Sequence, residues 1–298
     1  MSGNFSSVAD MLTEWQDGVQ GGTPPVTFPV ADEGHPLRCL EIGPGLVTMC
    51  GAPPAAGKTA LVMQLVFEAV RLSPDLKALV ANVEMGPPAL LDRQLARLAG
   101  LPLRRVRKRQ LTAADSEPLA KGLQAVGALA SRVAFLRPPF DLSNVARSAD
   151  EFGADLILLD YVQRIAPPKE YADKRLSLNA VMDTVRAMAD AGCAVLVVSA
   201  VGRQRDSQGK SSYDNLNLAS FRESSELEYG ADSAYLLIRE PDSGGALLKC
   251  VKNRNDEPQD ISLKFVGDYQ RFDPGGEDGK LSAALRGVWG GEAEGGEW

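Results

Sequence analysis

The apolar residues of this chain gather into short continuous runs that alternate with amphipathic stretches between about residues 37 and 273. The runs have the Val, Leu, Ile and Ala composition of buried strands and cover residues 46–50, 78–83, 132–136, 156–160 and 194–200. Stretches of helical character separate them, at residues 59–72, 87–99, 115–128, 142–152 and 177–190. Strands that are apolar throughout are typical of a parallel sheet covered on both faces. The pattern therefore predicts an α/β fold, with a mostly parallel central sheet flanked by helices.

A different rhythm begins after residue 232, where apolar segments follow one another with short turns between them. The segments cover residues 233–238, 246–253, 261–266 and 269–272. Short turns can join antiparallel strands, whereas parallel strands need a long crossover. We therefore expect antiparallel strands at the C-terminal side of the sheet.

The two ends of the chain differ from this central region of residues 37–273. Residues 1–20 carry one apolar stripe at helical spacing, formed by Val8, Met11, Leu12, Trp15 and Val19. Residues 21–36 are rich in Gly and Pro, which predicts a flexible linker. The stripe could fold back on its own domain or dock on a neighbouring subunit. Residues 274–298 form an acidic, Gly-rich tail that we expect to be disordered; it is either a solvated terminus or a peptide that docks on a partner.

The composition is typical of a globular protein of the cytoplasm. Of the 298 residues, 44% are hydrophobic and 24% are charged, no apolar stretch reaches the roughly 18 residues of a membrane span, and the start lacks the pattern of a secretory signal. Four widely separated cysteines and one histidine argue against a disulfide set or a zinc site. The net charge of −7 argues against a surface that coats duplex DNA, but not against a channel with local basic groups.

Residues 51–59 read GAPPAAGKT and fit the phosphate-binding pattern G-x-x-x-x-G-K-[ST], between an apolar strand and a helix as this motif requires. Backbone N–H groups of such a loop form an anion site with the helix N-terminus. The lysine neutralises the β- and γ-phosphates, and the hydroxyl holds Mg²⁺. The alternative is a glycine-rich turn. We therefore expect a site for a nucleoside triphosphate and Mg²⁺, with loop positions Gly51, Ala55, Ala56, Gly57, Lys58, Thr59 and Ala60.

Four charged residues outside the loop are candidates for the same site. Asp160 ends an apolar strand, where a carboxylate can hold a Mg²⁺-bound water. Glu84 follows another strand and can activate the attacking water, or else it is an exposed acid that starts the next helix. Lys252 and Arg254 are two positions apart on a predicted strand and point to the same side. They are either solvated or placed on a phosphate, in cis or across a subunit boundary, where an arginine raises the rate by about 10³–10⁵.

Taken together, these segments resemble the RecA-like C-terminal motor domain of DnaB-type replicative helicases. The resemblance runs from about residue 40 to residue 273. Besides the phosphate loop it includes NVEMGPPALLDRQLA, VRKRQLTAAD, LILLDYVQRI, SFRESSELEYGAD, KNRNDEP and FVGDYQRFD, in the family's order and at roughly its spacings. The segments FRESSELEYGAD and KNRN are far more specific than the phosphate loop alone.

The resemblance implies a role for each candidate. Glu84 is the catalytic base and Asp160 the acid linked to Mg²⁺. Lys252 and Arg254 reach in trans into the neighbouring site, so the active site forms only between subunits of a homo-oligomeric ring, usually a hexamer. The implied activity is that of an ATP-dependent 5′–3′ DNA helicase or single-stranded DNA translocase in replication, with a loader, a primase and a polymerase as possible partners.

The resemblance also indicates where single-stranded DNA binds. Arg222, Glu223 and Ser225 fall in the loop that lines the family's central channel and follows the backbone without reading bases. The segment PPKEYADKR at residues 167–175 has the character of channel-facing material. The basic run RRVRKR at residues 104–109 lies outside these loops, and we interpret it as a solvated face or a subunit contact rather than a DNA patch.

Two departures from the family bear on mechanism. Ala200 stands where the family usually has a glutamine that senses the γ-phosphate; Gln163 or Arg203 could compensate. The resemblance starts near residue 40, so we expect a motor without the family's N-terminal domain, as in a phage, a plasmid or another mobile element. Both departures favour an alternative function, a RecA-like DNA-binding ATPase switch or loader without processive unwinding. A RadA- or KaiC-type ATPase shares the fold but lacks the FRESSELEYGAD signature.

Overall fold

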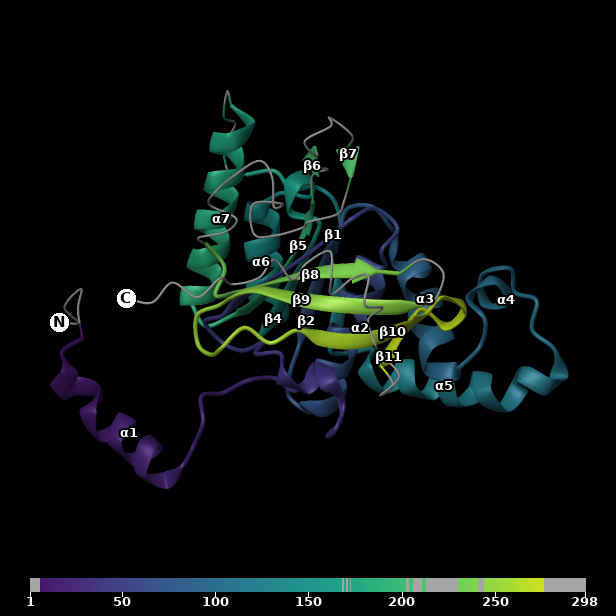
Figure 1. Ribbon diagram of the computed structural model, residues 1–298, viewed down its shortest axis with the longest axis horizontal. Helices are drawn as coiled ribbons and strands as arrows, with labels where there is room; N and C mark the ends of the chain where they lie inside the picture. The colour runs from purple at the N-terminus through teal and green to yellow at the C-terminus, as the bar shows by residue number, and fades with distance from the viewer. Residues whose placement is uncertain are drawn as a thin grey trace, which may run out of the picture.

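The computed structural model describes residues 6–167, 169, 171, 173–201, 204–205, 211–212, 230–240 and 244–275. Its centre is a nine-stranded sheet in the order β11-β10-β9-β8-β1-β5-β4-β2-β3 (Figure 1). The strands are β1 Val47–Ala52, β2 Ala78–Asn82, β3 Val133–Phe135, β4 Leu156–Asp160, β5 Ala194–Ala200, β8 Ser233–Arg239, β9 Gly245–Asn253, β10 Ile261–Val266 and β11 Arg271–Pro274. The two-residue strands β6 Gln204–Arg205 and β7 Ser211–Ser212 pair separately.

The strand directions confirm the predicted sheet. The strands β3, β2, β4, β5, β1 and β8 run parallel to one another, and β9, β10 and β11 add antiparallel pairings beyond β8. Every residue of β1, β2 and β4 is buried, because both faces of these strands are covered. This explains why their sequences are apolar throughout rather than alternating.

Helices cover the two faces of the sheet (Figure 1). They are α2 Lys58–Leu72, α3 Pro87–Ala99, α4 Leu103–Arg107, α5 Ser116–Leu129, α6 Leu142–Phe152 and α7 Lys174–Asp190. One core cluster joins the apolar residues of α2 to one face, and a second joins those of α6 and α7 to the other. Consecutive residues of β4 alternate between the two: Leu156 and Leu158 belong to the first cluster, Ile157 and Leu159 to the second.

Part of the predicted linker is packed rather than free. Val30 and Ala31 are buried, and the Phe28 N–H donates to the Ile42 carbonyl over 2.6 Å. Leu37, in the short 3₁₀ helix Pro36–Cys39, is fully buried. Phe28 and Val30 hold this half of the segment on the core, a contribution that its Gly and Pro content concealed. The expectation of a flexible linker over all of residues 21–36 was therefore wrong for this half.

The N-terminal helix α1, Val8–Gly21, forms where its stripe predicted and extends away from the body of the molecule (Figure 1). Ser7 and Asp10 make a reciprocal capping box, and Gly22 ends the helix in the left-handed conformation. None of the residues of this helix is buried, and Trp15 is 63% exposed. Among the described residues, no helix is long and apolar enough to cross a membrane.

Candidate active site

The loop between β1 and α2 has the backbone of an anion site. Gly57 caps α2 with a φ of 95°, which a side chain would strain, and an added Cβ would lie 3.2 Å from the ring of Phe272. Ala55 also has a positive φ, of 63°. The N-terminus of α2 begins at Lys58, at the carboxyl edge of the sheet, and its first N–H groups have no carbonyl partners within the helix. The loop can therefore cradle a phosphate group.

Asp160 lies against this loop at the end of β4. Its Oδ2 accepts hydrogen bonds from the Thr59 hydroxyl over 2.8 Å and from the Asn82 amide over 2.7 Å. Its Oδ1 is buried and has no hydrogen-bond partner among the described residues. Burial raises the pKa of Asp160 to about 6; the Thr59 hydrogen bond and the Lys58 charge lower it, and the Glu84 charge raises it further. A buried acceptor of this kind is suited to a cation or a bound water.

The residues present fit a magnesium ion. Mg²⁺ takes hard oxygen ligands, keeps several waters and uses only one or two protein groups together with substrate phosphates. Thr59 and Asp160 supply a hydroxyl and a carboxylate side by side. Within the part of the chain that the structure describes, no cluster of three or more His, Cys, Asp and Glu side chains could hold a metal by itself. This donor set therefore suits an ion that arrives with a nucleotide.

Glu84 lies at the same edge of the sheet. Asn82 and Asp160 are register partners on the adjacent strands β2 and β4. The Asn82 carbonyl Oδ1 accepts the backbone N–H groups of Glu84 over 3.0 Å and Met85 over 2.7 Å, and so fixes the turn after β2. Glu84 is exposed, and its charge contributes to the raised pKa of Asp160. The exposed carboxylate thus stands near the buried one.

Arg93 is a residue of this site that sequence reasoning missed. It lies on α3 and donates from Nη1 to the Gln270 side chain. Burial lowers the pKa of Arg93, and the nearby Arg107 lowers it further, whereas Asp160 raises it. The signal in the sequence was an arginine on the helix that follows Glu84.

Lys252 and Arg254 lie at the opposite edge of the sheet from the phosphate loop. The Arg254 N–H donates to the Asp232 carbonyl over 3.0 Å, and the Asp232 N–H donates to the Val47 carbonyl at the start of β1 over 2.8 Å. The loop follows the other end of β1, at a distance of about 20 Å for a strand of this length. This is farther than an arginine side chain extends, so neither cation can act on the phosphate loop of its own chain.

Comparisons with known proteins show the family to which this chain belongs. The sequence model of the DnaB-like helicase C-terminal domain family matches residues 42–274. The chain belongs to this family. It is 26% identical over 277 residues to the replicative DNA helicase DnaB of Pasteurella multocida, covering 88% of this chain and 57% of that protein. It is 25% identical over 244 residues to the DnaB of Leifsonia xyli, covering 77% and 52%. The chain thus spans about half the length of these curated relatives.

Solved structures share the fold. One solved ATPase domain matches with a TM-score of 0.78 at 18% identity, over 92% of this chain and all of that domain. A DnaB-like replicative helicase, described with its interactions with primase, matches with a TM-score of 0.76 at 17% identity, over 92% of this chain and 68% of that one. The RecA-like architecture predicted from the sequence is therefore confirmed.

Ala200 ends β5 beside the phosphate loop of this DnaB-like domain, because its register partner on β1 is Ala52. The Gln163 side chain occupies this point: its Nε2 donates to the Ser199 hydroxyl over 2.7 Å and to the Ala200 carbonyl over 3.1 Å, and its Oε1 accepts the Ala200 N–H over 3.2 Å. A glutamine amide therefore does lie at the end of β5, although it is supplied by the segment after β4.

Two aromatic contacts with cations border the loop. Lys58 Nζ lies 5.9 Å from the centre of the Tyr161 ring. Arg239, at the carboxyl end of β8, lies with its guanidinium carbon 5.0 Å from the centre of the Phe265 ring and donates to the Ala55 carbonyl over 3.4 Å. Sequence reasoning missed Arg239, because its position depends on the β8–β1 pairing.

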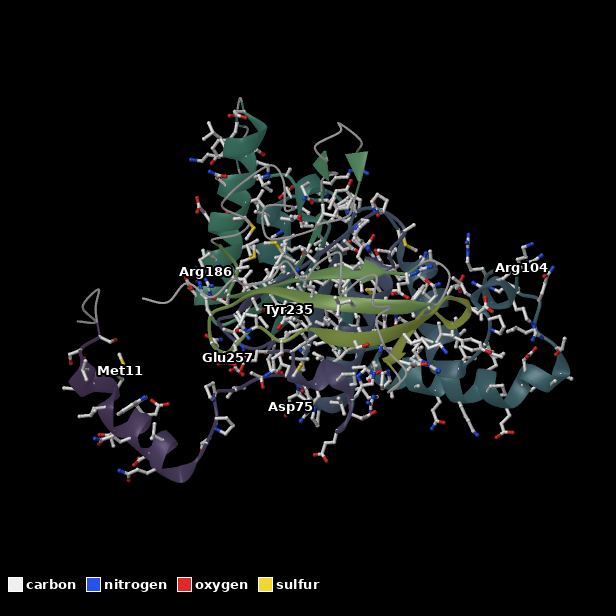
Figure 2. The ribbon with its side chains drawn as sticks, viewed as in Figure 1. Met11, Asp75, Arg104, Arg186, Tyr235 and Glu257 are labelled. Carbon is white, nitrogen blue, oxygen red and sulfur yellow. The ribbon has the colours of Figure 1, made fainter. Side chains whose placement is uncertain are left out.

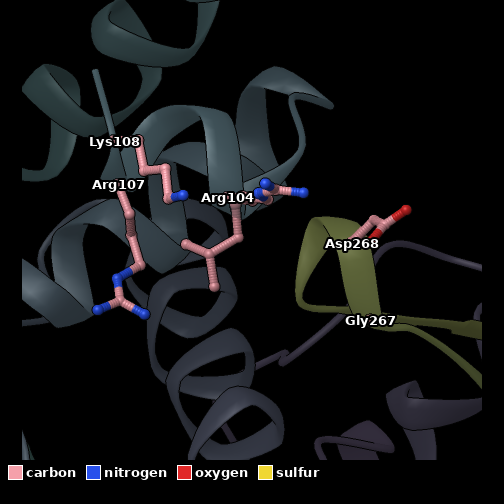
Figure 3. Close-up of a pocket in the computed structure, with 6 residues that line it drawn as sticks. Arg104, Arg107, Lys108, Gly267 and Asp268 are labelled. Atoms are coloured by element: carbon pink, nitrogen blue, oxygen red, sulfur yellow. The ribbon is translucent and has the colours of Figure 1, made fainter. Parts of the chain in front are cut away.

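The basic run at residues 104–109 forms α4 and the turn after it. Arg105 pairs with Asp115, and Arg109 pairs with Asp92 over 2.7 Å. The other three cations line a pocket of about 400 Å³ (Figure 3), together with Leu103, Gly267 and Asp268: they are Arg104, Arg107 and Lys108. The run therefore combines paired side chains with cations that face an open pocket.

The proposed DNA-contacting residues Arg222, Glu223 and Ser225 lie outside the described residues, as does Arg203. Of the segment at residues 167–175, Lys169 is exposed, and Lys174 begins α7. Their roles stay predictions.

Proposed function

We propose that this chain is the ATP-driven motor of a ring-forming DNA helicase that moves 5′–3′ along single-stranded DNA. The proposal rests on one observation: the cation of the phosphate loop and the two cations at the end of β9 lie at opposite edges of the sheet. Lys58 is at one edge of the sheet with Thr59 and Asp160, whereas Lys252 and Arg254 are at the other. A chain with half an active site at each of these two edges completes its sites only when the phosphate-loop edge of one copy packs against the opposite edge of the next copy. A closed ring lets every copy do so.

In a completed site, each residue has a distinct task. Lys58 and the α2 N-terminus bind the phosphates of ATP, while Thr59 and Asp160 hold Mg²⁺. When bound, Mg²⁺ neutralises charge on the phosphate oxygens. Glu84 orients and deprotonates the attacking water. Arg254 of the neighbouring subunit stabilises the charge of the transferring phosphoryl group, with Lys252 beside it.

Single-stranded DNA would pass through the ring and contact Arg222, Glu223 and Ser225 through its backbone. Binding would then tolerate any sequence and weaken with salt. The relatives named replicative DNA helicase support a role in replication. The solved helicase described with primase makes a primase the first partner to test, with a loader and a polymerase after it.

The test is strand displacement on a forked DNA substrate with ATP and Mg²⁺. We expect unwinding by the wild type and none by Lys58→Ala or Arg254→Ala, because each removes a cation from the phosphates. Lys121→Ala is the matched control, since Lys121 is an exposed residue of α5 that pairs with Glu117. A wild type that hydrolyses ATP with single-stranded DNA but never displaces a strand would exclude the helicase function.

A second candidate function, an ATP-gated DNA-binding switch without processive unwinding, is favoured by one observation. Ala200 has no side chain that can reach a phosphate, and the Gln163 amide beside it is held by Ser199 and the Ala200 backbone. Such a protein would bind DNA in its ATP state and release it after hydrolysis, without stepwise movement.

A further inference from the structure

Asp232 joins three separate parts of the chain at the edge of the sheet opposite the phosphate loop. Its Oδ2 accepts the Val47 N–H over 2.8 Å and a hydrogen bond from Arg186 Nη1 over 2.7 Å. Its Oδ1 accepts from Arg254 Nη1 over 3.1 Å. One carboxylate thus connects the first residue of β1, the helix α7 and the proposed trans-acting arginine.

The backbone reinforces this junction. The Arg254 N–H donates to the Asp232 carbonyl, and the Asp232 N–H donates to the Val47 carbonyl. Arg186 also donates from Nη2 to the Gly45 carbonyl, which braces α7 against the turn before β1. Figure 2 shows Arg186 at this edge, with Arg104 at the far side of the molecule. Both the backbone and the guanidinium of Arg254 are therefore tied to Asp232.

The carboxylate is suited to hold a partly exposed arginine. The Asp232 side chain is 14% exposed, whereas that of Arg254 is 48% exposed. Burial by itself raises the pKa of Asp232, but the Val47 N–H and Arg186 lower it, and the net pKa lies below the usual value. Asp232 stays ionised at neutral pH, and a guanidinium with five N–H donors can bind it and a phosphate oxygen together.

We propose that Asp232 is a positioning residue for Arg254, holding this arginine at the angle needed to enter the neighbouring ATP site. The inference rests on the proposed action of Arg254 in trans. Since a misplacement of about 1 Å can cost about 100-fold in rate, loss of the contact should be visible in turnover. The same carboxylate fixes the start of β1, whose other end carries the phosphate loop, so it couples the geometry of two consecutive sites in the ring.

The first experiment measures DNA-stimulated ATP hydrolysis by Asp232→Asn, which keeps an acceptor for the Val47 N–H but loses the charge. We expect kcat to fall about 10- to 100-fold, with KM for ATP changed less than about twofold, because Arg254 acts on the transition state rather than on ATP binding. Asp190→Asn is the matched control, because Asp190 is the other carboxylate partner of Arg186, at 3.0 Å, and its side chain is 68% exposed. It should turn over at the wild-type rate.

Two further measurements separate positioning from a general structural role. In an Arg254→Ala background, Asp232→Asn should have no additional effect, whereas independent damage to the fold would lower the rate by the same factor again. Mixed with Lys58→Ala subunits, Asp232→Asn should recover activity above the sum of the two separate rates. The Lys58→Ala subunit supplies an intact Arg254, and the Asp232→Asn subunit supplies an intact phosphate loop. Co-elution of tagged with untagged variants verifies subunit exchange.

The outcomes distinguish this inference from the proposed function. A mixture of Arg254→Ala with Lys58→Ala is the reference for action in trans. The positioning role is wrong if the reference mixture recovers activity and the Asp232→Asn mixture does not. It is also wrong if Asp232→Asn turns over like the wild type. In both cases the proposed function stands. If neither mixture recovers activity, Arg254 does not act in trans, and both the proposed function and the inference fail.

Discussion

Replacement of Asp160 by Asn should stabilise the nucleotide-free protein while abolishing hydrolysis. The carboxylate is almost completely buried, one of its oxygens has no hydrogen-bond partner in the described part of the chain, and Glu84 adds a second negative charge nearby. Asn has nearly the same shape and can still accept from Thr59. The substitution therefore removes a buried charge without creating a cavity, and under the proposed function this charge serves to hold Mg²⁺ with ATP.

The magnitude follows from proton linkage. The pKa of Asp160 is about 6 in the folded protein, against 3.8 for an ordinary aspartate. Between these values the folded state binds more protons than the unfolded state, so stability falls as the pH rises through this window. At pH 7 the ionised carboxylate lowers the free energy of unfolding by about 3 kcal/mol. This difference shrinks as the pH falls from about 6 toward the ordinary value of 3.8, and it is nearly absent below that value.

Urea unfolding of the wild type and Asp160→Asn, each at pH 7 and pH 5 without nucleotide or Mg²⁺, measures the effect. The variant serves as the reference for all other titrating groups. We expect its advantage to shrink by about 1–2 kcal/mol on going from pH 7 to pH 5. An Asn variant that is less stable than the wild type by the same amount at both pH values would show that Asp160 stabilises the fold, and would refute the idea of a carboxylate retained for ion binding.

Three more changes test other parts of the molecule. Gly57→Ala should destabilise the protein by about 1–3 kcal/mol and weaken binding of a fluorescent ATP analogue, because it strains a positive φ and crowds the Phe272 ring; unchanged binding would argue against the loop as the phosphate site. Ala200→Gln should raise DNA-stimulated ATP hydrolysis severalfold, and no change would indicate that Gln163 or another group already senses the phosphate. Deletion of residues 1–20 should shift the assembly toward smaller species in size-exclusion and mass measurements, because it removes the exposed stripe of α1; an unchanged size would mean that this helix does not hold subunits together.

The sheet could be predicted from the sequence because the composition of each central strand is itself typical of a buried strand. Runs such as LILLD are buried on both faces, and a covered parallel strand accounts for a run that is apolar throughout. The packed half of the predicted linker could not be predicted in this way. Its few apolar residues, among them Val30 and Phe28, lie between prolines, and their burial depends on β-strands that are distant in sequence.

The same division applies to the site. Lys58, Thr59 and Asp160 belong to local motifs, and the structure brings them together as those motifs imply. Arg93 and Arg239 reach the site only through the packing of α3 and the pairing of β8 with β1. Single residues of this kind have no flanking pattern, so only the three-dimensional arrangement reveals them.

The position of Ala200 relative to Arg254 bears on the choice between a motor and an ATP-gated switch. Ala200 lies at the phosphate edge of the sheet, next to the end of β1, whereas Arg254 and Asp232 lie at the other edge. Under the proposed function, Ala200 in place of a sensing glutamine affects the phosphate edge and leaves undisturbed the residues proposed to reach the neighbouring subunit. Since β1 is buried along its whole length and its first residue is hydrogen-bonded to Asp232, this strand links the two edges directly. Ring assembly and completion of the sites would then persist even where hydrolysis is loosely coupled to movement, so measuring hydrolysis alone cannot decide between a motor and a switch, and strand displacement must be measured with it.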